Sequence, residues 1–414
     1  MAQIENLKTE NKYKKTEIGE IPVSWGIAMI RDVCRHPEYG YTASAVEEPV
    51  GPKMLRITDI QEGRVLWDTV PYCRCPENMK NKFLLHRGDI LFARTGATTG
   101  KSYLIEDCPE TVFASYLIRI VTERQLDYRY LYFVFDSAIY WNQIKQKIGG
   151  SAQGGVNASL LSELQVPLPP IPEQKKIAEI LLTIDSAIDK ISQLIEKKKE
   201  LKKGLMQELL THGIGHKKFY KTEIGEIPKG WEVSNLGDIA KIRMGQSPAS
   251  SACFDYENGL PFFQGKAEFG TKYPNATKWC NSPTKIAERG DILISVRAPV
   301  GDINIALEKC CIGRGLSAVR GDQARQDFLY FVINFLKDKL AKAGQGSTFE
   351  AINKEVLFEL KIPLPPCSEQ KKIAEILSDI DADIEEEVSE KEKMKQLKKG
   401  LMQVLLTGKV RVKI

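Results

Sequence analysis

The chain has 414 residues, of which 43% are hydrophobic and 27% charged, and its formal net charge of +5 permits nucleic-acid binding without establishing it. This balance is typical of a folded globular protein and excludes a disordered or fibrous chain, and the length predicts two or three domains. No apolar run reaches the roughly 18 residues of a membrane span, and the first residues lack a signal-peptide core, which indicates a cytoplasmic protein without a membrane partner.

The chain is an imperfect tandem repeat. KTEIGEIP at 15–22 recurs at 221–228, an offset of 206 residues (221 minus 15), whereas PLPP at 167–170 recurs at 363–366, an offset of 196 (363 minus 167). Each copy therefore has a front half that has diverged in length and a back half that has not. Solenoid repeats have periods of roughly 20–50 residues, so this long period indicates a duplicated two-part domain.

The front half of each copy is predicted to be of mixed α/β type. Residues 1–13 are expected to be a flexible leader. Residues 14–165 form the first domain, in which the β-rich runs MLRITDI, GDILFAR, SYLIEDC and VFASYLIRIV alternate with Gly and Pro turns and precede one helical run at 131–148. Residues 214–361, a linker and the second domain, have the same order of segments.

The back halves, 166–213 and 362–414, are predicted to be long helices of about 38 residues and roughly 55–60 Å. Their apolar residues recur in alternating steps of four and three, which is a heptad pattern. We expect this apolar seam to form the helix-pair and partner interface. Its residues are Ile177, Leu181, Ile184, Ile188 and Ile191 in the first helix and Ile373, Leu377, Ile380 and Ile384 in the second.

The charges beside the seam favour an antiparallel pair. In a parallel pair the lysine-rich run at 197–203 would face the lysines at 393–399, whereas in an antiparallel pair it faces the acidic run at 381–386 and Asp185 approaches Lys398. The alternative is that these charges are simply solvated. The predicted fold class is α+β: two tandem mixed α/β domains separated by two long antiparallel helices that form a coiled coil, with pseudo-two-fold symmetry.

One loop, DILFARTGATTGKS at 89–102, is similar to a phosphate-binding P-loop. That motif needs four residues between its glycines, whereas Gly96 and Gly100 enclose three. The residues that follow are typical of strands and a turn, not of the helix whose N-terminus would hold a phosphate. The second copy has SVRAPVGD here, without a lysine. Nucleotide binding is therefore not expected.

The same loop suits DNA. Hydroxyls and backbone N–H groups bind phosphates, arginine binds guanine through two acceptors, and glutamine pairs with adenine in the same bidentate way. For each single residue the alternative is an ordinary surface side chain. The candidate DNA-binding residues are Arg56, Thr58, Asp59, Arg94, Thr95, Thr98, Thr99, Lys101, Gln264, Lys266 and Arg297.

Motifs for catalysis and metal binding are missing from the sequence. The nine cysteines are scattered without a C-x-x-C, which indicates reduced thiols, and the four histidines include no H-E-x-x-H. His212 and His216 lie in the linker, where solvated side chains are expected. There is no tetrapeptide of the kind that holds a flipped base and no Gly-rich turn for a methyl-donor cofactor. We assign no catalytic residue, no metal site and no cofactor to this chain.

Three motifs occur in the same order in both copies: GEIPxxW at 19–25 and 225–231, PLPP followed by EQKKIAEIL, and KKGLMQ. Over its whole length the chain resembles the specificity (S) subunit of Type I restriction-modification systems. The resemblance implies two target-recognition domains, each of which binds one half of a split, asymmetric site in double-stranded DNA. It also implies that the long helices set the spacer and dock two methyltransferase subunits, that restriction subunits join the complex, and that S-adenosylmethionine, ATP and magnesium belong to those partners.

Two other functions stay open. The chain could be a coiled-coil adaptor or scaffold protein without sequence-specific DNA recognition, or a free-standing nuclease or methyltransferase with unrecognised motifs. DNA affinity that is absent or independent of sequence in the assembled complex would favour the adaptor, and activity of the purified single chain would favour the enzyme.

Overall fold

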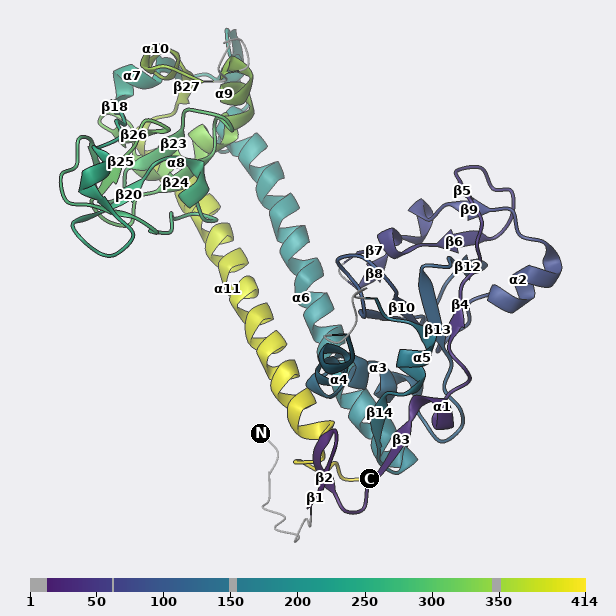
Figure 1. The fold of residues 1–414 in the computed structure, drawn as a ribbon. Helices are drawn as coiled ribbons and strands as arrows, with labels where there is room; N and C mark the ends of the chain where they lie inside the picture. The colour runs from purple at the N-terminus through teal and green to yellow at the C-terminus, as the bar shows by residue number, and fades with distance from the viewer. Residues whose placement is uncertain (1–12, 62, 149–154, 345–350) are drawn as a thin grey trace. The chain divides into compact units, whose positions relative to one another are not determined.

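The structure is a computed structural model and describes residues 13–61, 63–148, 155–344 and 351–414 (Figure 1). The chain divides into two compact units. The first comprises Met1–Ile191 with Glu390–Ile414, and the second comprises Ser192–Ser389. The predicted leader at residues 1–13 lies outside the described residues except for Tyr13, which begins strand β1 (Tyr13–Thr16).

Two four-stranded sheets form the centre of the first unit. The antiparallel sheet has the order β11-β10-β13-β4. The other has the order β12-β6-β9-β5, with β12 parallel to β6. The strands are β4 (Glu38–Tyr39), β5 (Ala45–Val46), β6 (Lys53–Leu55), β9 (Tyr72–Cys73), β10 (Ile90–Ala93), β11 (Ser102–Leu104), β12 (Thr111–Phe113) and β13 (Leu117–Ile120).

Strand β10 shows why the antiparallel sheet lies in the middle of this unit. All four of its residues are buried, the pattern of a strand that is covered on both faces. Ile90 and Phe92 belong to the core that extends into the following helices, whereas Leu91 belongs to a second core around β6 and β12. Because successive side chains of a strand point to opposite faces, one strand contributes to both hydrophobic cores.

The helical run predicted at 131–148 is two helices, α3 (Tyr128–Asp136) and α4 (Ala138–Ile148). The break is at Ser137, whose backbone N–H and hydroxyl both donate to the carbonyl oxygen of Val134, at 3.1 and 2.6 Å. A serine that bonds to its own preceding turn competes with the continuing helix. The prediction of a single helix was wrong for this reason.

The second unit repeats this plan. Its sheets have the orders β18-β26-β23-β24 and β19-β21-β20-β25-β22, and β20 is parallel to β25. Helix α8 (Gln326–Phe335) then packs on the core, as α3 does in the first unit. The predicted mixed α/β content of both copies is confirmed. The strands are β18 (Ala240–Met244), β19 (Cys253–Phe254), β20 (Leu260–Phe263), β21 (Trp279–Cys280), β22 (Ile286–Ala287), β23 (Ile292–Ser295), β24 (Ile303–Ile305), β25 (Cys310–Ile312) and β26 (Leu316–Gly321).

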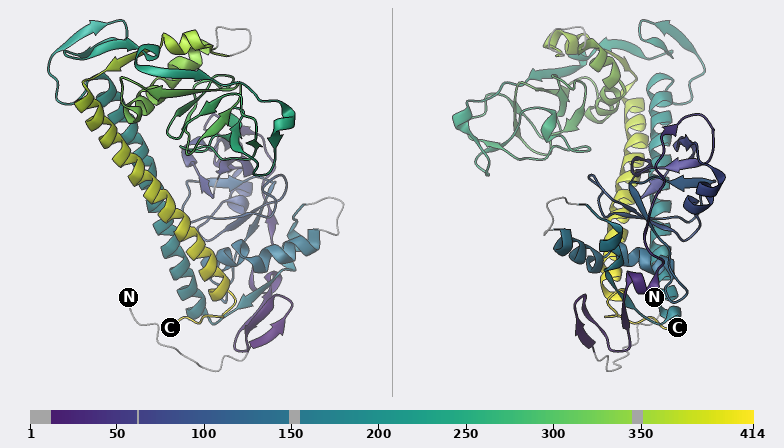
Figure 2. Two further views of the ribbon diagram at one scale, coloured as in Figure 1. Left: turned by 90° about the vertical axis from the view of Figure 1, so that its left-hand side faces the viewer. Right: turned by 45° about the vertical axis from the view of Figure 1, so that its right-hand side comes forward.

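The PLPP segments lead from the sheets into the long helices. Strand β14 (Gln165–Leu168) pairs with β3 (Gly26–Met29), and β27 (Lys361–Leu364) pairs with β17 (Glu232–Asn235). Two-stranded ribbons have only edge strands, which tolerate proline. Helices α6 (Ile171–Thr211, 41 residues) and α11 (Cys367–Leu405, 39 residues) follow, and each contributes one part to each unit. Within each unit the two helix segments run side by side (Figure 2).

Nine residues were predicted for the seam of the long helices. Ile177 and Leu181 lie in the core of the first unit, and Ile373 and Leu377 in the core of the second. Ile184 is also buried, whereas Ile188, Ile191, Ile380 and Ile384 are half-buried. The first turns of each helix therefore pack on the mixed α/β domain before them as well as on the neighbouring helix.

The other elements are short. No helix in the described part of the chain is long and apolar enough to cross a membrane. The remaining elements are β2 (Gly19–Pro22), β7 (Ile60–Gln61), β8 (Arg64–Val65), β15 (Phe219–Thr222), β16 (Gly225–Pro228), α1 (Ile30–Val33), α2 (Glu77–Phe83), α5 (Ala158–Ser162), α7 (Leu236–Ile239), α9 (Lys337–Gly344), α10 (Lys354–Phe358) and the 3₁₀ turns η1 (Ile57–Asp59), η2 (Trp67–Thr69), η3 (Ser250–Ala252) and η4 (Lys266–Glu268).

Candidate nucleic-acid interface

Four loops of the first unit are joined by backbone hydrogen bonds, and all the predicted DNA contacts of this unit lie on two of them. The N–H of Ala114 donates to the carbonyl of Leu55, where the second loop begins, and the N–H of Arg94 donates to the carbonyl of Tyr116. The first loop bonds to the fourth in the same way. We call these loops the first loop cluster; they are residues 39–43, 56–61, 94–101 and 114–116.

In this cluster Arg56 and Asp59 bind each other. The Nε and Nη2 of Arg56 donate to the two carboxylate oxygens of Asp59, at 3.0 and 2.7 Å, and the backbone N–H of Arg56 donates to the same group at 2.8 Å. This hydrogen bonding raises the pKa of Arg56. Asp59 therefore fixes the direction of Arg56, whose Nη1 has no protein partner among the described residues. Thr58, between them, is exposed.

The loop at 94–101 is a tight connection between β10 and β11. Gly96 and Gly100 have φ angles of +85° and +81°, which favour glycine. The hydroxyl of Tyr140 donates to the carbonyl of Gly100 at 2.6 Å and ties the loop to α4. Strand β11 begins at Ser102, so the loop leads into a strand, as the sequence predicted, whereas a P-loop leads into a helix.

Cations and hydroxyls line this loop. The guanidinium carbon of Arg94 lies 5.0 Å from the centre of the Tyr39 ring, a cation–π contact that positions the side chain. Lys101 is exposed and has no ion pair among the described residues. Thr95 is exposed, Thr98 is half-buried, and the Thr99 hydroxyl donates to a carbonyl of its own turn at 2.6 Å. The arrangement presents two cations and at least one free hydroxyl.

The second unit has an equivalent cluster. The N–H of Gly313 donates to the carbonyl of Phe263, that of Gly315 to the carbonyl of Gln264, and that of Val296 to the carbonyl of Gly315. The four loops of this second loop cluster are residues 245–249, 264–268, 296–302 and 313–315.

The predicted DNA-binding residues of the second cluster differ in whether their side chains already have a protein partner. The Ser247 hydroxyl donates to Oε1 of Gln264 at 3.0 Å. Lys266 forms an ion pair with Asp302 at 2.5 Å, so its charge is already partnered. Arg297 is exposed, with no ion pair among the described residues. All three predicted residues lie on loops of this cluster.

Sequence reasoning missed two residues of the second cluster, Ser247 and Arg314. Arg314 is exposed between two glycines, and its N–H donates to the Ser247 hydroxyl at 3.4 Å. The Gly-Arg-Gly sequence at 313–315 was the available signal, because a cation between two glycines is typical of a turn that closely approaches another group.

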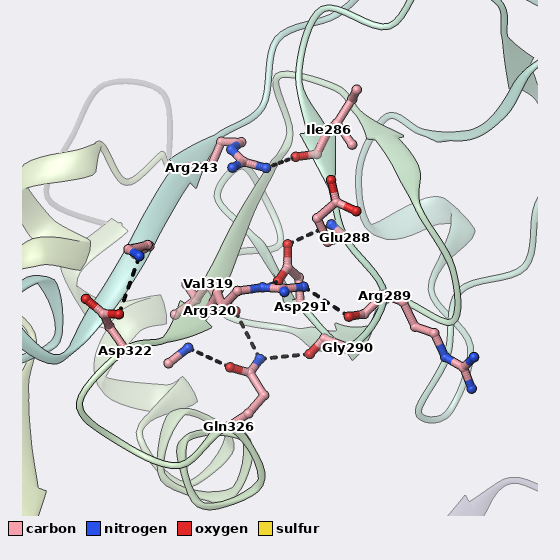
Figure 3. A network of polar contacts seen from close by, with 12 residues as sticks. Arg243, Ile286, Glu288, Arg289, Gly290, Asp291, Val319, Arg320, Asp322 and Gln326 are labelled. Atoms are coloured by element: carbon pink, nitrogen blue, oxygen red, sulfur yellow. Dashed lines mark hydrogen bonds and ion pairs between the residues drawn. The ribbon is translucent and has the colours of Figure 1, made fainter.

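The recurring RGDIL motif has a structural role behind each cluster. The carboxylates of Asp89 and Asp291 accept N–H bonds from the third residue before them, at 3.0 and 2.8 Å, and a glycine with positive φ precedes each. Arg119 of β13 approaches Asp89 at 3.4 Å, whereas Arg320 of β26 binds Asp291 at 2.5 Å (Figure 3). Burial raises the pKa of Asp89, while the N–H bond from its turn and the charge of Arg119 oppose that effect.

These two arginines do not occupy equivalent positions. In the first unit Ile90 is opposite Ile120, and the arginine is the residue before; in the second Ile292 is opposite Val319, and the arginine is the residue after. The two copies therefore pair the equivalent buried aspartate with arginines that come from different positions of the neighbouring strand. The RGDIL segment therefore holds a turn and lies outside both loop clusters.

The EQ pair of the PLPP motif joins the first unit to its long helix. Glu173, 1% exposed, accepts the indole N–H of Trp25 at 3.0 Å and two bonds from Arg411 at 2.5 and 2.8 Å. Gln174 accepts the backbone N–H of Asp127, the N-cap of α3, at 2.8 Å and donates to the carbonyl of Pro169. We call this arrangement the first EQ latch. It explains why the GEIPxxW and EQ motifs recur together.

The second EQ latch has the same plan, with a histidine in the place of the arginine. Glu369 accepts the indole N–H of Trp231 at 3.0 Å, and its other oxygen lies 2.9 Å from Nε2 of His216. Gln370 accepts the backbone N–H of Arg325 at 2.9 Å and donates to the carbonyl of Pro365. His216 therefore has a specific partner, in contrast to the solvated position that the sequence predicted for it.

Charged residues along the long helices pair as the antiparallel prediction required. In the second unit Lys202 lies 2.5 Å from Asp381, and Lys198 lies 3.5 Å from Asp383. In the first unit Asp185 lies 2.7 Å from Lys398. In the second unit the residue numbers thus fall along α6 as they rise along α11.

The described residues contain no group of three His, Cys, Asp or Glu side chains that could hold a metal ion. All nine cysteines are free thiols, and burial raises the pKa of several of them, for instance that of Cys73 to about 11.

Comparison with known proteins gives one family. The family model of the Type I restriction modification DNA specificity domain matches residues 22–203 and 228–395. The putative type I restriction enzyme MjaX specificity subunit of Methanocaldococcus jannaschii is 40% identical over 418 residues, which cover 98% of each chain.

Two solved structures are similar over nearly the whole chain. One, from work on complex assembly and conformational transition of the type I R-M system, has a TM-score of 0.58 and 27% identity and covers 94% of this chain and 99% of that one. The Type I restriction-modification system S subunit from M. genitalium has a TM-score of 0.59 and covers 92% and 96%; at 16% identity it supports the fold alone.

Each matched segment contains one loop cluster and both the tryptophan and the EQ pair of one latch. The repeat, the fold and the family model thus agree on two copies of one domain. The chain belongs to the Type I restriction modification DNA specificity domain family.

Proposed function

We propose that the chain is the DNA sequence-specificity subunit of a Type I restriction-modification complex and that each loop cluster binds one half of a bipartite, asymmetric site in double-stranded DNA. The observation that carries the proposal is that each unit gathers exposed hydrogen-bond donors from separate segments onto one set of loops. Base edges and phosphates are recognised by such donors. The donors differ between the units, which supports two different half-sites.

The two long helices are proposed to form an antiparallel coiled coil that separates the recognition domains and sets the unread spacer. The order of the ion pairs within each unit supports this arrangement. An antiparallel pair turns a head-to-tail duplication into a pseudo-two-fold object, so that two domains of one chain meet DNA in opposite orientations. The same helices are proposed to dock two methyltransferase subunits.

We propose that the chain does no chemistry itself. S-adenosylmethionine, ATP and magnesium would then be bound by the methyltransferase and restriction subunits. The specificity-subunit names of its relatives and the DNA-binding character of the loop clusters support this division of roles.

The test is to co-express the chain with its methyltransferase subunit and to map methylated bases across the host DNA. A motif of two different parts with a fixed gap supports the proposal. Insertion of a whole heptad in α6 and a matching one in α11 should then lengthen the gap and leave both half-sites unchanged. No new methylation from a stable, cofactor-bound complex would contradict the proposal and favour the adaptor.

A further inference from the structure

Residues of the second loop cluster line one part of an open hollow of about 570 Å³. Two of its lining residues, Gln264 and Arg314, offer side-chain donors without partners: neither the amide nitrogen of Gln264 nor the guanidinium of Arg314 forms a hydrogen bond or ion pair with any described residue. Ser247, Phe262, Asp255 and Lys278 also line the hollow. A hollow that is part apolar and has a few convergent polar groups is typical of a binding site.

The backbone around Arg314 is built for close contact with Gln264. A Cβ added at Gly313 would lie 2.4 Å from Oε1 of Gln264, and one added at Gly315 would lie 2.5 Å from the carbonyl oxygen of Gln264. Real side chains do not tolerate such distances, so the turn depends on glycine at both positions. Arg314 is the one residue of this turn with a side chain, and the turn holds it beside Gln264.

Ser247 fixes the amide of Gln264. Its hydroxyl donates to Oε1 of Gln264 and in turn accepts the N–H of Arg314. This identifies the oxygen and the nitrogen of the amide and leaves the nitrogen to donate outward. An amide oxygen has two lone pairs, so Oε1 still has one for a second donor. A fixed amide with both functions available is the arrangement that binds adenine.

Other cations of the cluster are less suited to this role. Lys266 is paired with Asp302, and Arg297 does not line the hollow. In the first unit, strand register places Arg56 at the position of Gln264 and Ser115 at the position of Arg314. The donor pair is therefore peculiar to the second unit.

We propose that Gln264 and Arg314 recognise two purines of the half-site bound by the second unit, an adenine at Gln264 and a guanine at Arg314, and that Ser247 is the positioning residue for Gln264. The assignment rests on the proposed function. Arginine binds O6 and N7 of guanine with its two-pronged donor group, and glutamine binds N6 and N7 of adenine.

The test uses the complex with the methyltransferase subunit and duplexes in which each base pair of the second half-site is replaced in turn. Arg314→Ala is expected to lower discrimination at one guanine by roughly 10–100-fold, and Gln264→Ala to do the same at one adenine. Ser247→Ala should weaken discrimination only at the adenine of Gln264, and by less. The first half-site, which these changes leave untouched, reports whether each variant still folds and assembles.

The matched control is Arg289→Ala. Arg289 is an exposed arginine of the same unit. It precedes β23, whereas the cluster loop 296–302 follows that strand, and its guanidinium points away from the surrounding polar network (Figure 3). It should leave the motif unchanged. Gln264→Glu, which keeps the size of the side chain and removes its donor, should lose the adenine as Gln264→Ala does.

Two results would overturn the assignment alone. One is an unchanged second half-site in both Arg314→Ala and Gln264→Ala. The other is a uniform loss of affinity for all duplexes with a salt slope lower by about 1, which would place Arg314 on a phosphate. If the unaltered complex recognises no bipartite motif, the proposed function fails and this assignment with it.

Discussion

The two EQ latches use nearly the same contacts, whereas the two loop clusters present different side chains at equivalent positions. In each latch a glutamate accepts an indole N–H at 3.0 Å and a glutamine holds the first N–H of a helix. In the loop clusters Arg56 corresponds to Gln264 by strand register.

This difference separates two tasks within one fold. Under our proposal the two latches present equivalent long helices to the same kind of partner, so their contacts are shared. The loop clusters meet different sequences under our proposal, so their donors differ. The latches are alike except for the second partner of the glutamate, which is Arg411 in the first and His216 in the second.

The largest expected effect comes from the first latch. Glu173→Ala leaves the indole of Trp25 and the guanidinium of Arg411 without their acceptor and should lower the free energy of unfolding of the first unit by about 2–4 kcal/mol. Glu369→Ala should cost the second unit less, because Glu369 is 14% exposed and its second partner is the single ring nitrogen of a histidine, whereas Glu173 binds two nitrogens of an arginine. Hydrogen exchange in α3 and α8 measures the two units separately.

The control for the latch variants is Glu179→Ala on the exposed face of α6, where an ion pair with Lys176 should contribute under about 1 kcal/mol. Neither latch variant should change the recognised bases in complexes that still assemble. If Glu179→Ala lowered the free energy of unfolding as much as Glu173→Ala does, the latch would stabilise the fold no more than a surface ion pair.

The next largest effect should separate the loop cluster from the latch. Arg94→Ala removes an exposed cation of the first loop cluster and should weaken binding to the target DNA roughly tenfold, as expected for a lost contact with guanine. Its free energy of unfolding should change by less than about 0.5 kcal/mol. Arg87→Ala, at the other end of β10, removes another exposed arginine of the same unit and is the control. Equal losses of affinity in both variants would remove Arg94 from the interface.

The pairing of the long helices predicts a smaller effect. Lys202→Glu places two negative charges where Lys202 and Asp381 now pair and should lower the free energy of unfolding of the second unit by about 1–2 kcal/mol. Adding Asp381→Lys should restore at least half of the loss, which a double-mutant cycle measures. If the loss of unfolding free energy in the double variant equalled the sum of the losses in the two single variants, the pairing of Lys202 with Asp381 would be contradicted.

The smallest effect depends on pH and concerns the helix that the latch holds. Burial alone would raise the pKa of Asp127, but hydrogen bonds from Arg129 lower it below its ordinary value. A carboxyl group with a lowered pKa stabilises the folded state above its unfolded pKa, near 3.9, and this contribution is lost as the pH falls through the folded pKa.

Asp127→Asn keeps the N-cap acceptor and removes the charge. It should lower the stability of the first unit by under about 1 kcal/mol at pH 7, and the difference should shrink below pH 4. Thermal unfolding of both proteins at pH 7 and pH 3.5 measures it. A difference that grows toward acid pH would contradict the assignment. The N-cap residue of the equivalent helix in the second unit is Arg325, which this change leaves untouched, so hydrogen exchange in α8 should not change.

The long helices and the order of their charges could be predicted from the sequence because both signals are periodic along one segment. The heptad spacing of apolar residues predicted the two long helices, α6 and α11. The charges beside that pattern predicted that Asp185 approaches Lys398. The same local reasoning was wrong at Ser137, where a single side-chain bond to the preceding turn divides the helical run.

The latches could not be predicted, because their contacts join residues that are far apart along the chain. Glu173 and Arg411 are separated by 238 positions, and nothing in the residues beside either of them indicates that the two side chains pair. The pairing of Arg56 with Asp59 is local, but their separation alone does not show that the two side chains bind each other. Arg314 was missed because only the pairing of β20 with β25 brings it beside Gln264. The individual DNA contacts stay predictions.

The most direct test of this division of tasks is to map DNA methylation by the complex of this chain with its methyltransferase subunit, using the unaltered chain, Arg94→Ala and Glu173→Ala in parallel. We predict a two-part motif in which Arg94→Ala relaxes only the half bound by the first unit, while Glu173→Ala lowers the yield of methylation without changing any recognised base. A motif altered by Glu173→Ala, or left intact by changes in both loop clusters, would contradict the account.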